Sequence, residues 1–313
     1  MREPLTTLTD DLLARPGGPG RTLLTGWFSF DDGEVTVGDA LAQRRVSQAL
    51  TACGIAHDTA WSRGFAPDRM PLDAADPAAY GHVVFTCGPA HGEQLLRLHR
   101  QFSECRRLAV GVSVIDPGDP AVTGFDRVFA RDEPAAAPAV DLAAAAPLHS
   151  VPPLAGVVLT YGQGEYAERR RHDTVGGALI EWLTRLDCTR VAADTRLAID
   201  DWRHCATPEQ FMGLAARLDT VVTNRLHGMV LGLRAGTPVL AVDPVLGGAK
   251  VTAQARALRW PAVIPADEVT PKTLDRWWEW CLSPAGRAAA GRRARLMARS
   301  AGPTGHDYVP RFR

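Results

Sequence analysis

A strand–helix–strand unit between Asp219 and Pro244 constrains the fold of this chain more than any other feature. Its first part, Thr220 to Thr223, is a short β-branched run that is typical of a buried strand. Asn224 follows and is a preferred helix N-cap residue. Apolar residues then recur at helical spacing and predict one buried helix face, made by Leu226, Met229, Val230 and Leu233.

The end of this unit is marked just as clearly. Gly236 stands where a helix stops in the left-handed conformation, and Pro238 prevents its continuation. Val239 to Val242 is again strand-like. Two neighbouring strands that are joined through a helix run parallel with a right-handed crossover, so the unit predicts a parallel α/β sheet.

The same alternation recurs along the chain. Short apolar runs lead into turns, several of which contain glycine, and then into helical patterns. Further strands are predicted at 22–25, near 55, and at 82–87, 108–114, 128–130, 157–161 and 191–193. The alternation predicts two Rossmann-like βαβ domains that face each other across a cleft, with their strand ends pointing inward.

Composition indicates where the two domains meet. Between Glu133 and Gly156 the chain shifts to Ala and Pro, and its periodicity is lost. A chain of 313 residues also exceeds the size that one hydrophobic core normally supports. We therefore predict an N-terminal domain at 1–150 and a C-terminal domain at 151–313.

The two ends of the chain differ in character. Residues 1–20 are polar with Pro and Gly, and we expect a mobile arm there. Beyond Pro271 the pattern is helical, and we expect Trp277, Trp278 and Trp280 to serve packing.

Arg225, His227 and Gly228 occupy the first helical turn of the unit at 219–244. In open α/β sheets, ligands bind beyond the carboxyl ends of the strands, where helix N-termini favour an anion. Arg225 adds a planar fork suited to phosphate or carboxylate, His227 can exchange a proton, and Gly228 leaves room for a close approach. The alternative is that Arg225 and His227 only cap and solvate the helix start.

Further cations lie near the same predicted edge. Lysine occurs only at Lys250 and Lys272, and Lys250 follows the strand that ends near Asp243, so it is either a ligand contact or a surface lysine. The run from Arg169 through Arg171 to His172 is either an exposed charge cluster or a loop that closes over a phosphate.

Three residues of the predicted N-terminal domain are weaker candidates. Asp39 follows Gly38 at a helix start and either caps that helix or accepts a proton from a substrate hydroxyl. His91 lies in a turn between a strand and a helix and is either incidental or a ligand contact. Arg131 either forms a structural salt bridge with Asp132 or contacts substrate.

Composition and missing motifs exclude several classes of function. The chain has 35 basic and 35 acidic residues, so no overall charge attracts nucleic acid, and no apolar run approaches a membrane span. Six scattered cysteines without C-x-x-C fit a reducing cytoplasm better than a disulfide framework. No G-x-G-x-x-G, Walker loop or G-x-S-x-G is present, and no residue set has metal spacing, so we expect neither a cofactor nor a metal.

The 219–251 segment resembles the signature of the polysaccharide pyruvyl transferase family. Short matches in the expected order extend the resemblance over roughly 22 to 260. The residues that carry it are Gly38-Asp39-Ala40, Arg131-Asp132, Asp141-Leu142-Ala143, Asp219 to Val222, Arg225-Leu226-His227, Ala235 to Val239 and Lys250-Val251.

The resemblance implies a glycosyltransferase-B-like fold and transfer of the pyruvyl group of phosphoenolpyruvate to a sugar as a ketal. Phosphoenolpyruvate is then a co-substrate for the C-terminal domain, and the sugar acceptor belongs to the N-terminal domain. On this basis His227 is the candidate acid and Asp39 the candidate base. The candidate donor-binding residues are Asn224, Arg225, Gly228 and Lys250.

Two other functions remain open on the sequence. A nucleotide-sugar glycosyltransferase of the same fold would use Arg225 and Lys250 to hold a diphosphate. A sugar- or anion-binding protein without catalytic activity would keep the fold alone, because one fold serves many functions.

Overall fold

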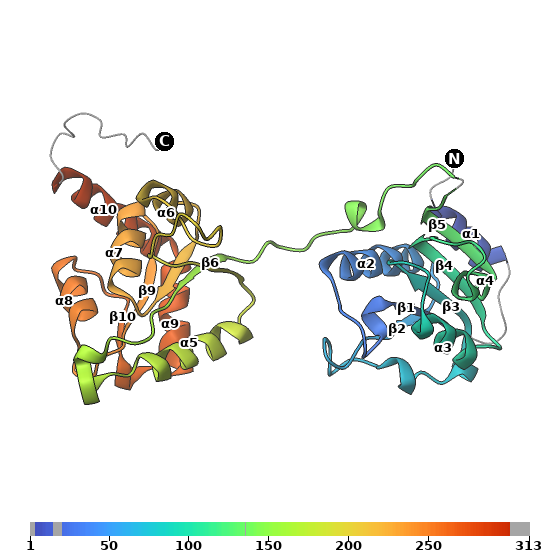
Figure 1. Ribbon diagram of the computed structural model, residues 1–313, viewed down its shortest axis with the longest axis horizontal. Coiled ribbons are helices and arrows are strands. Elements are labelled where there is room, and N and C mark those ends of the chain that lie inside the picture. Colours follow the sequence, from blue (N-terminus) through green and yellow to red (C-terminus); the bar gives the residue numbers. More distant parts are fainter. Residues whose placement is uncertain (1–3, 15–20, 135, 301–313) are drawn as a thin grey trace. The chain divides into compact units, whose positions relative to one another are not determined.

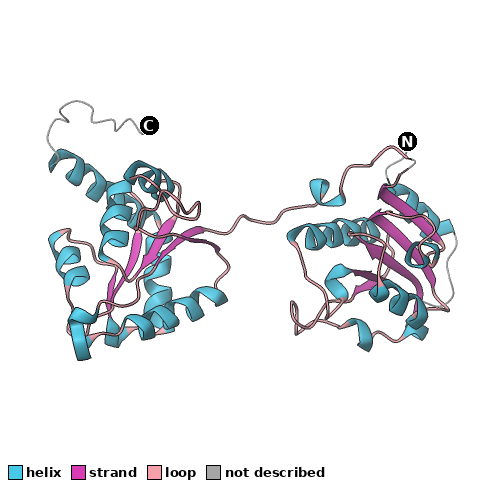
Figure 2. Cartoon of the chain, viewed as in Figure 1, coloured by secondary structure: helices cyan, strands magenta, loops and turns pink. Residues whose placement is uncertain are grey.

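The computed structural model describes residues 4–14, 21–134 and 136–300 of the chain. It divides into two compact units, Met1–His149 and Ser150–Arg313. The secondary structure of each is drawn in Figure 2, and each unit is an α/β domain in its own right. In the part of the chain that the structure describes, no helix is both long and apolar enough to cross a membrane.

The N-terminal unit has one sheet whose strands all run parallel. The strands in its described part are β1 Arg21–Gly26, β2 His57–Thr59, β3 Tyr80–Thr86, β4 Arg106–Ser113 and β5 Arg127–Asp132. Its α-helices are α1 Pro4–Ala14, α2 Val37–Ala52, α3 Glu93–Gln101 and α4 Pro120–Thr123. The strand order is β2-β1-β3-β4-β5 (Figure 1).

Alternation along the strands explains why helices cover both faces of this sheet. In β1, Leu23 packs with the residues of α3 and α4, whereas its neighbour Leu24 packs with those of α1 and α2. Val83 and Val84 of β3 separate in the same way. Successive side chains of a strand point to opposite faces, so near-continuous apolar runs require a cover on each side.

The expectation of a mobile arm at residues 1–20 is wrong for residues 4–14. These residues form α1, whose Leu5, Leu8 and Leu12 are buried against α2 and the sheet. Their spacing of three and four places them on one helix face. Polar residues between the leucines obscured this stripe, and residues 1–3 and 15–20 lie outside the described residues.

The C-terminal unit also has a parallel sheet. The strands among its described residues are β6 Leu154–Val158, β7 Thr189–Ala192, β8 Thr220–Thr223, β9 Val239–Asp243 and β10 Val263–Pro265. Its α-helices are α5 His172–Arg185, α6 Pro208–Ala215, α7 Leu226–Ala235, α8 Lys250–Ala257, α9 Pro271–Leu282 and α10 Pro284–Ser300. The strand order is β10-β9-β8-β6-β7.

Both units therefore share one topology. In each, the first strand of the sheet lies between the second and the third, and the fourth and fifth follow on the side of the third. The predicted fold class, two Rossmann-like parallel α/β domains, is confirmed in this respect. Such sheets bind ligands at the switch point beyond the carboxyl ends of the first and third strands, which are β6 and β8 in the C-terminal unit.

Most strand predictions are close to the observed bounds, and β6 is the main exception. It runs from Leu154 to Val158, although the apolar residues 157–161 predict a later start. Leu154 pairs with Thr189 of β7, and Ala155 with Thr220 of β8. Proline at 152 and 153 concealed this start, because proline lacks a backbone donor and suggests a linker.

The tryptophans of the C-terminal unit pack against one another, as predicted. Trp182 of α5 meets Trp278 of α9 edge to face, with ring centroids 5.6 Å apart. Trp280 contacts both Trp260 and Trp277 in the same way. These pairs pack α9 against α5 and against the segment that precedes β10.

We expect Leu8→Ala to destabilise the N-terminal unit by about 2–5 kcal/mol, because it leaves a cavity between α1 and the sheet. Leu13→Ala is the matched control, since Leu13 is 56% exposed in the same helix. Urea unfolding followed by hydrogen exchange of peptides from each unit measures the effect. Equal stability of the two variants would show that α1 does not pack as described.

Candidate functional site

The turn between β8 and α7 lies at the switch point of the C-terminal unit, and Asn224 organises it. The Asn224 amide accepts a hydrogen bond from the Thr160 N–H at 2.7 Å and donates to the Thr160 carbonyl at 3.0 Å. It is 1% exposed. The prediction that Asn224 is the helix N-cap is therefore wrong, because its side chain ties the end of β6 to the end of β8, and Arg225 occupies the N-cap position.

Arg225 points its guanidinium past β6 to the residues that follow the carboxyl end of β7. Its Nη1 donates to Oδ1 of Asp194 at 2.6 Å, and both side chains are about one-fifth exposed. Burial opposes ionisation of Asp194, but hydrogen bonds from Arg196 and the charge of Arg225 outweigh burial and hold its pKa below the usual range. The pair orients the guanidinium and leaves the other edge of its fork for a further anion.

Gly228 has a packing role that the sequence did not indicate. A Cβ at this position would lie 2.3 Å from Thr223 Oγ1 and 3.1 Å from Val158 Cγ1. The glycine lets α7 pack closely on β8 and β6, and it is buried. The expectation that Gly228 leaves room for a ligand is corrected accordingly, because protein atoms occupy that space.

His227 presents its imidazole at the open side of the same turn. It is the second residue of α7 and is exposed. The first intrahelical bond of α7 runs from the Met229 N–H to the Arg225 carbonyl. The N–H groups of Leu226, His227 and Gly228 precede it and add the partial positive charge of a helix N-terminus to that of Arg225.

At the N-terminus of the neighbouring helix α8, a carboxylate of the protein itself already binds the free N–H groups. The buried Asp243 carboxylate accepts hydrogen bonds from the N–H groups of Ala249 at 2.7 Å and Thr252 at 2.8 Å. Lys250, at the start of α8, places its Nζ 4.0 Å from Glu165 and 5.7 Å from the centre of the Tyr166 ring. Of these two N-termini, α7 is the one better suited to an external anion.

The loop after β6 carries the arginine run and folds against the loop after β9. Backbone hydrogen bonds join Arg171 N–H to the Pro244 carbonyl and Leu246 N–H to the Arg169 carbonyl. Nη1 of Arg171 donates hydrogen bonds to the carbonyls of Glu168 and Arg170. The side chain of Arg169, in contrast, is exposed. The loop is thus anchored beside Lys250, with Arg169 the more available of the two arginines.

His172 begins α5 beneath this loop. It is 1% exposed, and its ring stacks on Tyr166. Burial, followed by the charges of Arg170 and Lys250, lowers the pKa of His172. The lowered pKa disfavours a buried imidazolium beside the cationic side chains of Arg170 and Lys250.

In the N-terminal unit, Asp39 completes a capping box. Its Oδ2 accepts hydrogen bonds from the Thr36 N–H at 3.1 Å and from the Thr36 hydroxyl at 2.8 Å. Burial and the neighbouring Asp39 raise the pKa of the Cys87 thiol. Asp39 thus lies beside the carboxyl end of β3 as a helix-capping carboxylate at the third helical position.

The other candidates of this unit form ion pairs. His91 Nδ1 meets Oδ2 of Asp119, and the hydrogen bond from Ala121 N–H, followed by that of His91, lowers the pKa of Asp119. Arg131 pairs with Asp132 at 2.7 Å and with Asp141 at 2.6 Å. Arg131 therefore forms structural salt bridges, which was one of the two roles considered for it.

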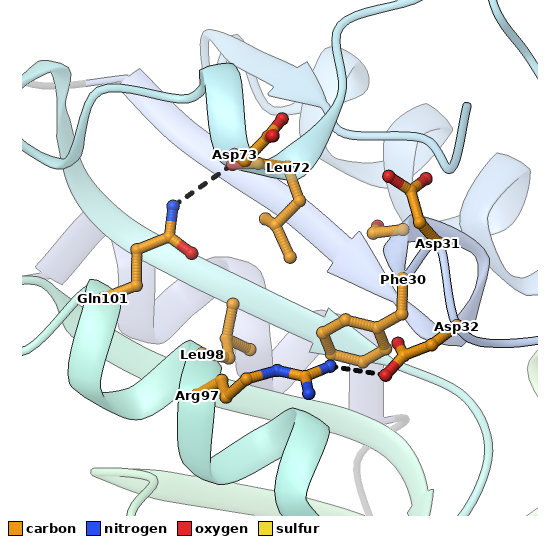
Figure 3. Close-up of a pocket in the computed structure, with 9 residues that line it drawn as sticks. Phe30, Asp31, Asp32, Leu72, Asp73, Arg97, Leu98 and Gln101 are labelled. Atoms are coloured by element: carbon orange, nitrogen blue, oxygen red, sulfur yellow. Dashed lines mark hydrogen bonds and ion pairs between the residues drawn. The ribbon is translucent and has the colours of Figure 1, made fainter.

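A pocket of about 290 Å³ lies between α3 and the loop after β1 (Figure 3). Its carboxylates are already neutralised by arginine: Asp32 pairs with Arg97, and Asp31 and Asp73 pair with Arg63. Gln101 donates to the Leu72 carbonyl. With its charges paired internally, this pocket offers little to a charged ligand. The described residues contain no group of three or more His, Cys, Asp or Glu that could hold a metal ion.

A protein-family model matches the segment that contains the turn between β8 and α7. Residues 179–244, from within α5 to just after β9, match the family model for polysaccharide pyruvyl transferase, which confirms the resemblance over that segment. The segment includes Asp194, Asn224, Arg225 and His227. No curated protein sequence matches the chain.

Solved structures with similar chains include the following three. Spinosyn Forosaminyltransferase SpnP is 13% identical, with 90% of this chain and 95% of that chain covered and a TM-score of 0.34. Acinetobacter baumannii MurG is 12% identical, with 88% and 95% covered and a TM-score of 0.31. E. coli heptosyltransferase WaaC with ADP is 12% identical, with 87% and 99% covered and a TM-score of 0.27. At these TM-scores, none of the three carries an argument about the reaction.

Sequence reasoning missed Asp194, Thr160 and Tyr166. Asp194 stands two residues beyond β7, and its place at a strand end was a usable signal. Thr160 contributes only backbone groups, and Tyr166 reaches Lys250 across a distance of 84 positions, so neither contact has a local signature.

We expect Gly228→Ala to destabilise the C-terminal unit by about 1–3 kcal/mol without any ligand, because the added methyl group overlaps Thr223. Gly177→Ala is the control, since Gly177 is exposed within α5 and a Cβ there meets nothing within 4 Å. That change should add about 0.5–1 kcal/mol of stability. Unchanged stability of Gly228→Ala in urea unfolding would contradict the packing role.

Proposed function

We propose that the protein transfers the pyruvyl group of phosphoenolpyruvate to two hydroxyl groups of a sugar, forming a ketal and releasing phosphate. The observation that carries this proposal is the family match at 179–244, which spans the turn where Arg225 and the exposed His227 meet the N-terminus of α7. The C-terminal unit supplies the donor side and the N-terminal unit the acceptor side.

Phosphoenolpyruvate has a phosphate and a carboxylate, so its site needs cations and N–H donors. Arg225 supplies a fork that Asp194 holds in place, and the first turn of α7 supplies backbone donors. Arg169 lies on the loop after β6, which is hydrogen-bonded to the loop after β9, and Lys250 begins the helix that follows the second loop. We assign them to the phosphate, whose charge grows as it leaves.

The reaction needs a proton at the methylene carbon of the donor. We assign this proton to His227, because its imidazole is exposed beside the anion-binding turn. Protonation leaves an electron-poor carbon that the first sugar hydroxyl attacks, the phosphate departs, and the second hydroxyl closes the ketal. The two hydroxyl protons balance the proton gained by the methyl group and the one carried off by phosphate.

The acceptor hydroxyl requires a base, and Asp39 is our candidate. Its Oδ2 is occupied by Thr36, so only the remaining oxygen can accept the proton.

We expect His227→Gln to lower kcat by about 10²–10⁴-fold with the fold unchanged, which is the usual contribution of a general acid. His149→Gln is the matched control, since His149 is also exposed. Phosphate release from phosphoenolpyruvate, measured over a panel of glycosides, provides the rate. Near-native turnover by His227→Gln would remove the assignment, and nucleoside diphosphate release from nucleotide sugars instead would overturn the proposed reaction.

Asp39→Asn separates catalysis from capping. Asparagine keeps an acceptor for the Thr36 N–H, so stability should change little, whereas loss of the base should reduce kcat by about 10²–10⁴-fold. Asp39→Ala should in addition cost about 0.5–2 kcal/mol of stability through the lost cap. If Asp39→Asn retains native kcat, capping is the whole role of this residue.

A further inference from the structure

A second pocket of the N-terminal unit lies beside its edge strand β2 and has a volume of about 630 Å³. It is formed by β2 itself, by the segment that follows β2, and by Gln43 of α2. β2 pairs only with β1 in the described sheet, so its outer side has no strand neighbour there. The volume falls within the range of about 300–1,000 Å³ that is typical of small-molecule sites.

Two aromatic rings provide one wall of this pocket. Trp61 and Phe65 stack with centroids 5.7 Å apart and an interplanar angle of 29°. Trp61 is held from behind by the fully buried Phe28 and through its backbone by the Met70 carbonyl. Phe65 is 56% exposed. The pocket therefore presents an aromatic surface whose position is fixed by the residues that contact Trp61.

Polar groups face the same space in a fixed arrangement. Gln43 Nε2 donates to the Thr59 hydroxyl at 3.1 Å, which orients both side chains. Asp58 bonds to Arg21 at 2.7 Å, and this hydrogen bond lowers the pKa of Asp58. Arg69 is exposed at the pocket wall. The pocket thus combines acceptors and donors, and its one carboxylate is already paired.

We propose that this pocket binds a pyranose ring of the carbohydrate acceptor, stacked on Trp61 and Phe65, with its hydroxyl groups bonded to Gln43, Thr59 and Asp58. One face of a pyranose carries C–H groups with slight positive charge, which suits the negative face of an aromatic ring. Its hydroxyl groups both donate and accept, as the opposite wall requires. The proposal rests on the proposed function for its choice of acceptor, and it adds a subsite away from the reacting hydroxyls.

Binding to the full-length protein tests the subsite without any turnover. Methyl glycosides of glucose, galactose and mannose are titrated in saturation-transfer NMR, with uridine and adenosine as competing aromatic ligands. We expect saturable binding of at least one glycoside and a Kd about 3- to 10-fold weaker in Phe65→Ala, in line with the loss of one aromatic contact. Gln43→Ala should weaken binding as well.

Trp202→Ala is the matched control, because Trp202 is 93% exposed outside this pocket. Three outcomes overturn the subsite: no glycoside binds, binding is equal in Phe65→Ala and Trp202→Ala, or only the nucleosides bind. Glycoside binding without phosphate release from phosphoenolpyruvate would instead overturn the proposed reaction and leave the subsite intact. If phosphate is released and Phe65→Ala changes neither glycoside binding nor KM, the subsite is overturned and the proposed reaction stands.

Discussion

The buried amide of Asn224 is the interaction on which the candidate donor site depends. It satisfies both backbone groups of Thr160 just beyond β6, at a point where the strand ladder has ended. An unpaired backbone group at a buried position costs about 1–3 kcal/mol, so the amide replaces ladder bonds that the diverging chain cannot make. Arg225 and His227 follow Asn224 in the chain, so the hydrogen bonds between Asn224 and Thr160 also fix their positions at the switch point.

A second constraint is the competition between helix N-termini for negative charge. Asp243 gives α8 a carboxylate from its own chain, and Asp194 gives Arg225 a counter-ion. The first turn of α7 lacks a side-chain cap from its N-cap residue. Asp243 thus occupies the N-terminus of α8, whereas the first turn of α7 keeps N–H donors of the kind that bind an anion.

Periodicity predicted the parts of the structure that local physics controls. The strand at Thr220–Thr223, the helix after it and its stop at Gly236, where φ is +86°, all occur as expected. Long-range geometry was beyond reach. Asn224 is a residue type that often caps a helix, but its amide is bonded to Thr160, which lies 64 positions away. Gly228 serves packing because Val158 of β6 and Thr223 of β8 lie directly against it. Leu5, Leu8 and Leu12 have the spacing of one helix face, yet the polar residues between them suggested a mobile segment instead of a packed helix.

The shared topology of the two units makes their differences informative. In the N-terminal unit the indole of Trp27 donates to the Pro89 carbonyl beyond β3, and a Cβ at Gly88 would lie 2.1 Å from this ring. Trp27 therefore fills the space between the ends of β1 and β3 that corresponds to the donor turn between β6 and β8. The largest aromatic contribution to a pocket of this unit lies instead beside the edge strand β2, where Trp61 is partly buried and Phe65 is exposed. One topology thus carries Arg225 at an uncapped helix start in one unit and an aromatic pocket beside an edge strand in the other.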